Sequence, residues 1–145
     1  MLLLNYLCSM IQQKEFTLPA FKRGFHIITD LVVKQLPELP AHGLLHLFIK
    51  HTSAGLTVNE NYSPDVLTDF EACFNKLIPE NQPYYTHNDE GSDDMPAHVK
   101  TAMVGYSITI PITANQLNLG TWQGIYLCEF RNKAAGRKIV ITVYS

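Results

Sequence analysis

The stretch GLLHLFIKHTSAGLTVNEN, Gly43–Asn61, decides the fold class of this chain. Its first part, Gly43–Lys50, is a nearly continuous apolar run of strand length and predicts a core strand. Gly55–Asn59 is interpreted as the continuation of that strand after a local break at Thr52–Ala54. Similar runs, bounded by turn residues, occur on both sides of this stretch. The chain is therefore expected to be rich in β-strands.

Five further runs are predicted strands because β-branched and aromatic residues are frequent in them: Ile11–Leu18, Gly24–Thr29, Ser107–Thr113, Gly120–Arg131 and Lys138–Tyr144. The segments between the last three, Asn115–Asn118 and Asn132–Gly136, are predicted turns.

Three helices are expected between these strands. A short one, Leu31–Gln35, follows a capping Asp30. The clearest begins at Ser63-Pro64-Asp65, which supplies a capping hydroxyl, a proline at the first helical position and an early acid, and it ends before Pro79. The third is Pro96–Val104. The resulting order predicts an α+β, β-dominated fold: a compact antiparallel β-sandwich with two main helices packed alongside.

Length and composition indicate one domain and exclude some classes of function. With 145 residues, 11 basic and 13 acidic, the chain lacks the positive charge typical of nucleic-acid binding. Three cysteines without a CxxC pair argue against a disulfide scaffold or a cysteine-type zinc site, and they favour a cytoplasmic protein.

The apolar N-terminus needs a separate interpretation. It has no basic residue before Lys14 and about half the length of a membrane span, so neither a signal peptide nor a membrane partner is expected. Residues 1–9 are interpreted as an extension, with Met10 a possible natural start and 10–145 a single domain.

The stretch THNDEGSDDMPAHVK, Thr86–Lys100, concentrates histidines and carboxylates. His87 and His98 here, with His51 upstream, lie at element ends among small or acidic residues. Three neutral imidazoles with an open fourth position are what a catalytic zinc or similar divalent ion requires. Asp94 is placed to orient His98 as a supporting carboxylate. Simple helix capping by Asp93 or Asp94 is the alternative, and it needs no metal.

Thr52 and Ser53 follow His51 directly and offer hydroxyl and backbone donors to an anion. A Ser–His hydrolase with Ser53 as nucleophile is a weaker hypothesis, because adjacent strand residues face opposite ways and no GxSxG elbow is present. Asn59 and Glu60 either supply an amide and a carboxylate to a ligand or satisfy a turn.

Two downstream groups add candidates. The glycines of Gly120–Gly124 allow a ligand or another chain to approach the backbone, and Trp122 there is either a stacking residue or a core or interface residue. A basic cluster either binds phosphate or forms a solvated hairpin tip: Arg131, Lys133, Arg137 and Lys138.

Four motifs in this order resemble the YjbQ family, also called the secondary thiamine-phosphate synthase enzyme family: RGFHIITD, GLLHLFIKHTSAGLTVNEN, HNDEGSDDMPAHVK and GTWQGIYLCEFR. The resemblance covers essentially Met10–Ser145. It implies a compact β-sandwich subunit, a homotrimer, and a site around the motif histidines. It also implies a weak ability to make thiamine phosphate, in which a thiazole phosphate displaces pyrophosphate from a pyrimidine-methyl pyrophosphate.

Carried over by motif, the family histidines fall on His51, His87 and His98, its NEN acid on Glu60, and its GTWQ segment on Gly120–Gln123. The expectation is a metal-assisted enzyme acting on a small phosphorylated metabolite. The three histidines would hold a divalent ion (zinc, or magnesium or manganese), Glu60 or Asp94 would orient a ligand or move a proton, and no organic cofactor is expected. Residues expected to bind substrate or phosphate are Thr52, Ser53, Asn59, Thr121, Gln123 and Arg131. A metabolite- or metal-binding accessory protein without turnover remains the alternative.

Overall fold

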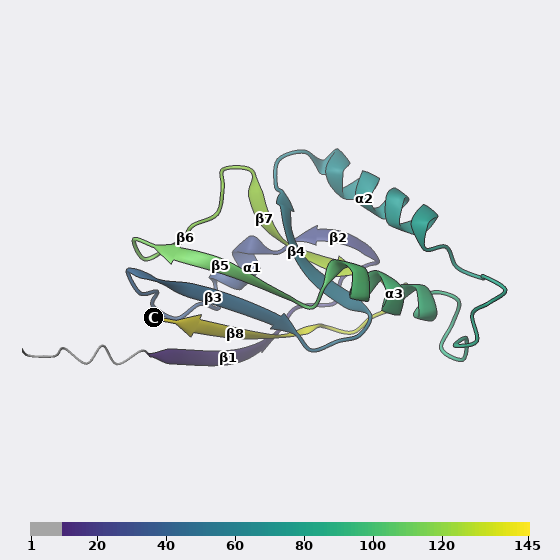
Figure 1. Cartoon of the computed structure of the whole chain (residues 1–145), viewed down its shortest axis with the longest axis horizontal. Coiled ribbons are helices and arrows are strands. Elements are labelled where there is room, and N and C mark those ends of the chain that lie inside the picture. The colour runs from purple at the N-terminus through teal and green to yellow at the C-terminus, as the bar shows by residue number, and fades with distance from the viewer. Residues whose placement is uncertain (1–9) are drawn as a thin grey trace, which may run out of the picture.

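The computed structural model describes residues 10–145, and the extension expected at residues 1–9 lies outside them (Figure 1). The elements follow in this order: β1 (Ile11–Thr17), β2 (Gly24–Ile27), α1 (Thr29–Val33), β3 (His42–Ile49), β4 (Ala54–Glu60), α2 (Pro64–Leu77), α3 (Asp94–Val104), β5 (Ser107–Thr113), β6 (Gln116–Leu117), β7 (Gln123–Glu129) and β8 (Lys138–Tyr144). No helix within residues 10–145 is long and apolar enough to cross a membrane.

The strands form two antiparallel sheets, one with the order β1-β8-β3-β5-β6 and a smaller one with the order β2-β7-β4. Inward-facing residues of both sheets belong to one buried cluster, in which Leu45 and Ile141 of the larger sheet accompany Leu56 and Ile125 of the smaller. The predicted strand-dominated α+β fold is therefore confirmed.

The helices α2 and α3 cover the outer face of the smaller sheet (Figure 1). A second buried cluster fills this layer, with Phe25, Tyr126 and Phe130 packed against Phe70 and Phe74 of α2. Because β7 has the core on one face and the helices on the other, every residue from 124 to 129 is buried. Lys100 joins the two helices: its Nζ donates to Asn75 Oδ1 at 2.7 Å, and burial together with the charge of Arg23 lowers its pKa to about 8.

Two expectations about strands need correction. Gly55–Asn59 does not continue the core strand, because β3 and β4 belong to different sheets and residues 50–53 carry the chain across. The predicted turn Asn115–Asn118 contains the short strand β6, which pairs with the end of β5. Ala114 and Asn115, with φ of 51° and 63°, make the tight hairpin between them.

The expected helix starts are nearly right, but their caps differ. Ser63 lies at the N-cap of α2 without a side-chain capping bond. α3 begins at Asp94 rather than Pro96, and Asp93 at its N-cap makes no capping bond either. The short helix α1 begins at Thr29, so Asp30 lies in its first turn and is not its cap.

Candidate metal centre

The first turn of α3 presents Asp94 and His98 on one face, because residues four apart on a helix lie above one another. His87 approaches the same point from the preceding loop. Its Nε2 lies 2.8 Å from Asp94 Oδ2, and His98 Nε2 lies 3.5 Å from Asp94 Oδ1. One ligand atom from each side chain lies within 4.8 Å of the others. The fold thus gathers two imidazoles around one carboxylate.

The orientation of the His98 ring is fixed from the crossover between the sheets. His98 Nδ1 lies 2.9 Å from the backbone carbonyl oxygen of Thr52. A carbonyl can only accept a hydrogen bond, so Nδ1 carries a proton, and in the neutral form of the ring the lone pair is on Nε2, 3.5 Å from Asp94 Oδ1. This arrangement is typical of metal-binding histidines, whose second ring nitrogen usually donates to a carbonyl or carboxylate.

Arg131, directly after β7, supplies the counter-charge. It donates through Nη1 to Asp94 Oδ1 and through Nε to Asp93 Oδ2, the latter at 3.0 Å. Burial opposes the charge of Arg131, but Asp93, Asp94 and Glu90 outweigh it and raise its pKa. Burial likewise opposes ionisation of Asp93, yet hydrogen bonds from the Asn132 amide and from Arg131 outweigh it and lower its pKa. The Asp93 carboxylate accepts hydrogen bonds from Arg131 and from the Asn132 amide, and it makes no capping hydrogen bond to the helix.

The carboxylate of Asp94 is only 1% exposed, and one of its oxygens lacks a hydrogen bond. Although His87 Nε2 is within ion-pair distance of Oδ2, its N–H direction is not aligned with that oxygen. Ligand atoms about 2.0 Å from a tetrahedral zinc lie about 3.3 Å from each other. The 3.5 Å between His98 Nε2 and Asp94 Oδ1 is close to this spacing, whereas the 2.8 Å between His87 Nε2 and Asp94 Oδ2 is shorter, so binding an ion would require His87 and Asp94 to move apart.

His51 lies outside this ligand set, in contrast to the expected three-histidine site. Its Nε2 accepts the backbone N–H of Lys138 at 2.9 Å, and its Nδ1 lies 3.3 Å from Arg137 Nη1. Burial, followed by the charge of Arg137, lowers the pKa of His51 and favours the neutral ring. The third member of the candidate cluster is thus Asp94, where His51 is expected from the sequence.

Ser53 and Arg137 form a separate buried network. Arg137 donates to both oxygens of Glu129, at 2.6 and 2.5 Å, and to Ser53 Oγ at 3.2 Å. Within residues 10–145 no hydrogen bond joins His51 to Ser53, so the geometry offers the Ser–His hydrolase no support. No local pattern predicted the pairing of Glu129 with Arg137, since these residues meet only across the β7–β8 connection.

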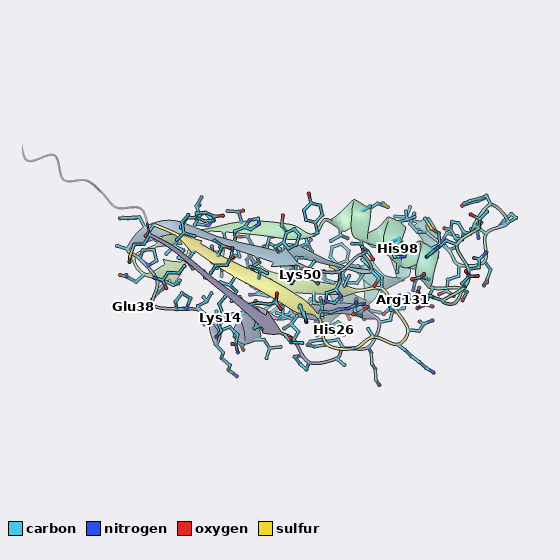
Figure 2. The ribbon with its side chains drawn as sticks, turned by 90° about the horizontal axis from the view of Figure 1, so that it is seen from below. Lys14, His26, Glu38, Lys50, His98 and Arg131 are labelled. Atoms are coloured by element: carbon cyan, nitrogen blue, oxygen red, sulfur yellow. The ribbon has the colours of Figure 1, made fainter. Side chains whose placement is uncertain are left out.

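An open groove of about 790 Å³ runs beside the centre. Apolar side chains line much of it, including Phe48 and Tyr106, whose rings meet edge to face at 5.5 Å. His51, Thr52 and His98 form its polar side. Figure 2 shows His98 and Arg131 at the same end of the molecule, opposite to Glu38.

The remaining predicted site residues lie at the other end of the smaller sheet. β4 and β7 pair from Ala54 with Glu129 at the histidine end to Glu60 with Gln123 at the far end. Six residue steps along a strand correspond to about 20 Å. Asn59, Thr121 and Gln123 are exposed there: Asn59 Oδ1 accepts the Glu60 N–H, and Gln123 Oε1 accepts the Gly120 N–H. The structure therefore divides the predicted site into two regions.

The fold and the clustered side chains define a two-sheet α+β protein with a His–Asp–His candidate metal centre. The chain belongs to the UPF0047 YjbQ-like family, whose model matches residues 14–145. It is 46% identical over 136 residues to the UPF0047 protein YjbQ of Escherichia coli O157:H7, covering 92% of this chain and 98% of the relative.

Solved structures agree with this assignment. A conserved hypothetical protein from Thermus thermophilus is 32% identical, with a TM-score of 0.77 over 88% of this chain and 97% of the other. A YbjQ-like protein of unknown function from Sulfolobus solfataricus is 20% identical and shares the fold, with a TM-score of 0.81 over 94% of this chain and 99% of the other.

Proposed function

We propose that the protein is a metal-assisted enzyme acting on a small phosphorylated substrate, with a divalent ion held by His87, Asp94 and His98. The observation that carries this proposal is the buried Asp94 oxygen, which lacks a hydrogen bond and faces an imidazole nitrogen. Two nitrogens and one carboxylate oxygen form a ligand set that zinc accepts, with a fourth position open to water or substrate. When bound, such an ion would polarise a phosphoryl oxygen or activate water.

The protein's own groups have supporting roles in this proposal. Arg131 holds the Asp94 carboxylate in place through a hydrogen bond to Oδ1, and the Thr52 carbonyl accepts a hydrogen bond from His98 Nδ1. Arg131 and Arg137 are both neutralised by carboxylates, so neither is free to bind a phosphate. The ion would supply the positive charge that a pyrophosphate leaving group needs. Thr52, exposed and lining the groove, offers a hydroxyl donor to an anion.

The groove beside His98 suits the ring portion of such a substrate. Tyr106 and Phe48 offer aromatic surface, and a volume of about 790 Å³ is within the range of small-molecule sites. A thiamine-phosphate synthase-like reaction is one candidate. There the thiazole nitrogen forms a bond to the pyrimidine methylene carbon while the carbon–oxygen bond to pyrophosphate breaks. The family resemblance suggests this reaction, and the apolar groove is compatible with it.

The test is formation of thiamine phosphate from the two phosphorylated halves by purified protein loaded with zinc or manganese. We expect product beyond one equivalent per chain, and a loss of about 100-fold or more in Asp94→Asn, since a missing ligand disables the centre. Asp89→Asn removes a nearby exposed carboxylate and serves as the matched control. If substrate is retained at about one equivalent per chain without turnover, the accessory-protein alternative is correct.

We further propose, from the cysteine pattern, that the protein is cytoplasmic and, from the resemblance, that it forms a homotrimer. Light scattering should then give three times the 16.4 kDa mass of one chain. The mass of a single chain at micromolar concentration would contradict the trimer.

A further inference from the structure

A second pocket lies at the far end of the smaller sheet, about 20 Å from the candidate metal centre by strand length. It is an open cavity of about 500 Å³ lined by Val58, Asn59, Glu60, Tyr62, Trp122 and Gln123. These residues come from the end of β4, the connection to α2 and the start of β7. None of the groups around Asp94 contributes to it.

Two aromatic rings form a corner of this pocket. The rings of Tyr62 and Trp122 meet at 81° with centroids 4.9 Å apart. Tyr62 is 73% exposed and Trp122 is 56% exposed, so within residues 10–145 a large part of their aromatic surface is accessible. Aromatic faces carry the negative part of the ring quadrupole, and they attract cations within about 6 Å.

The backbone that carries the two rings is fixed although the rings are exposed. The Asn61 N–H donates to the Trp122 carbonyl at 2.8 Å, and Asn61 Nδ2 donates to the Gln123 carbonyl at 3.1 Å. The Tyr126 hydroxyl donates to the Glu60 carbonyl from beneath. The corner is therefore held in place before any ligand arrives, which reduces the entropy lost on binding.

The pocket has an unbalanced negative charge. Glu60 is half-buried, and within residues 10–145 its carboxylate accepts no hydrogen bond and forms no ion pair. The lining described above contains no basic residue. Burial, together with the nearby charge of Glu60, raises the pKa of Tyr126. A carboxylate without a partner beside accessible aromatic surface is a combination that recognises an organic cation.

We propose that the pocket formed by Glu60, Tyr62 and Trp122 binds a small organic ammonium ion. The ammonium group would pack against the indole and phenol faces, and the Glu60 carboxylate would balance its charge. The amides of Asn59 and Gln123 at the rim are available to polar substituents. This site is separate from the proposed metal centre and requires neither a metal nor a phosphate.

Intrinsic fluorescence provides a direct test because Trp122 is the only tryptophan of the chain. Choline chloride is the probe, sodium chloride controls for ionic strength, and 3,3-dimethylbutanol is the uncharged analogue of the same shape. We expect a saturable change in emission with choline, at least tenfold weaker binding of the uncharged analogue, and at least tenfold weaker binding of choline by Glu60→Gln.

Glu38→Gln makes the same charge change at a glutamate outside this pocket and should bind choline as the wild type does. Tyr62→Leu should weaken choline binding while leaving far-ultraviolet circular dichroism unchanged. A response to choline that is linear and equal to that of sodium chloride would overturn the proposal. Equal affinity for choline and its uncharged analogue, or full affinity in Glu60→Gln, would overturn it too.

Discussion

The two ends of the β4–β7 strand pair differ in whether the carboxylates there have a charged partner. At the end near Ala54, Glu129 is fully buried and paired with Arg137, and Asp94 is held by Arg131. At the other end Glu60 has no charged partner within residues 10–145, and Trp122 lies in solvent. One end of the strand pair, here called the closed end, therefore has buried carboxylates paired with arginines, whereas the other end is an open pocket with an unpaired carboxylate. Stability should depend on the first region, and ligand binding without metal on the second.

The largest expected effect is at the closed end. Glu129→Ala leaves the Arg137 guanidinium buried without a counter-charge, so we expect a loss of about 3–5 kcal/mol in the free energy of unfolding, measured with urea. The same substitution at Glu60 should change stability by less than about 0.5 kcal/mol. Equal losses at the two glutamates would remove the distinction between the two ends.

The next largest loss of unfolding free energy is expected in the backbone that holds Tyr62 and Trp122 in the open pocket. A Cβ added at Gly124 would lie 2.9 Å from Asn61 Cβ, within the strand pairing that positions Trp122. Gly124→Ala should cost about 1–3 kcal/mol through overpacking. At Gly120 the nearest atoms belong to the flexible Gln123 side chain, so Gly120→Ala should be nearly neutral in the same urea experiment. If Gly124→Ala and Gly120→Ala lost the same unfolding free energy, the backbone around Gly124 would not be rigid.

A smaller effect concerns pH at the closed end. The pKa of His51 is lowered in the folded state, so the unfolded chain binds a proton more readily there. The resulting stability is fully present above the ordinary histidine pKa of about 6.5 and is lost as pH falls through the lower folded value. We expect His51→Gln to lose less unfolding free energy than the wild type between pH 7.5 and pH 5. His42→Gln, at an exposed histidine with no ion pair in residues 10–145, should follow the wild type.

Local signals were enough to predict most elements of this fold. Proline at position 64 and glycine at position 105 bound α2 and α3 as expected, and the apolar run at Gly43–Lys50 is β3 within one residue at each end. The sheet to which β4 belongs could not be predicted, because pairing with β7 joins residues more than sixty positions apart. Strand periodicity says which face is buried but not which partner covers it.

The same limit applies to the candidate site. The sequence predicts Asp94 as a support for His98 because it lies just before the expected helix start at Pro96, and the structure places both residues in one helix. That His87 joins Asp94 and His98 while His51 does not depends on the paths of the α2–α3 loop and the β3–β4 crossover. The separation of Glu60 and Gln123 from the histidines follows from strand register, which the sequence does not encode locally.

The central claim is that His87, Asp94 and His98 hold a divalent ion, and metal analysis tests it most directly. Tag-free protein is loaded with zinc or manganese, desalted and analysed for metal, with Asp94→Asn, His98→Ala and the control Asp89→Asn in parallel. The proposal predicts about one equivalent of metal per chain in the wild type and in Asp89→Asn, and almost none in the other two variants. Metal-free wild type after loading, or the same metal content in Asp94→Asn, would contradict it.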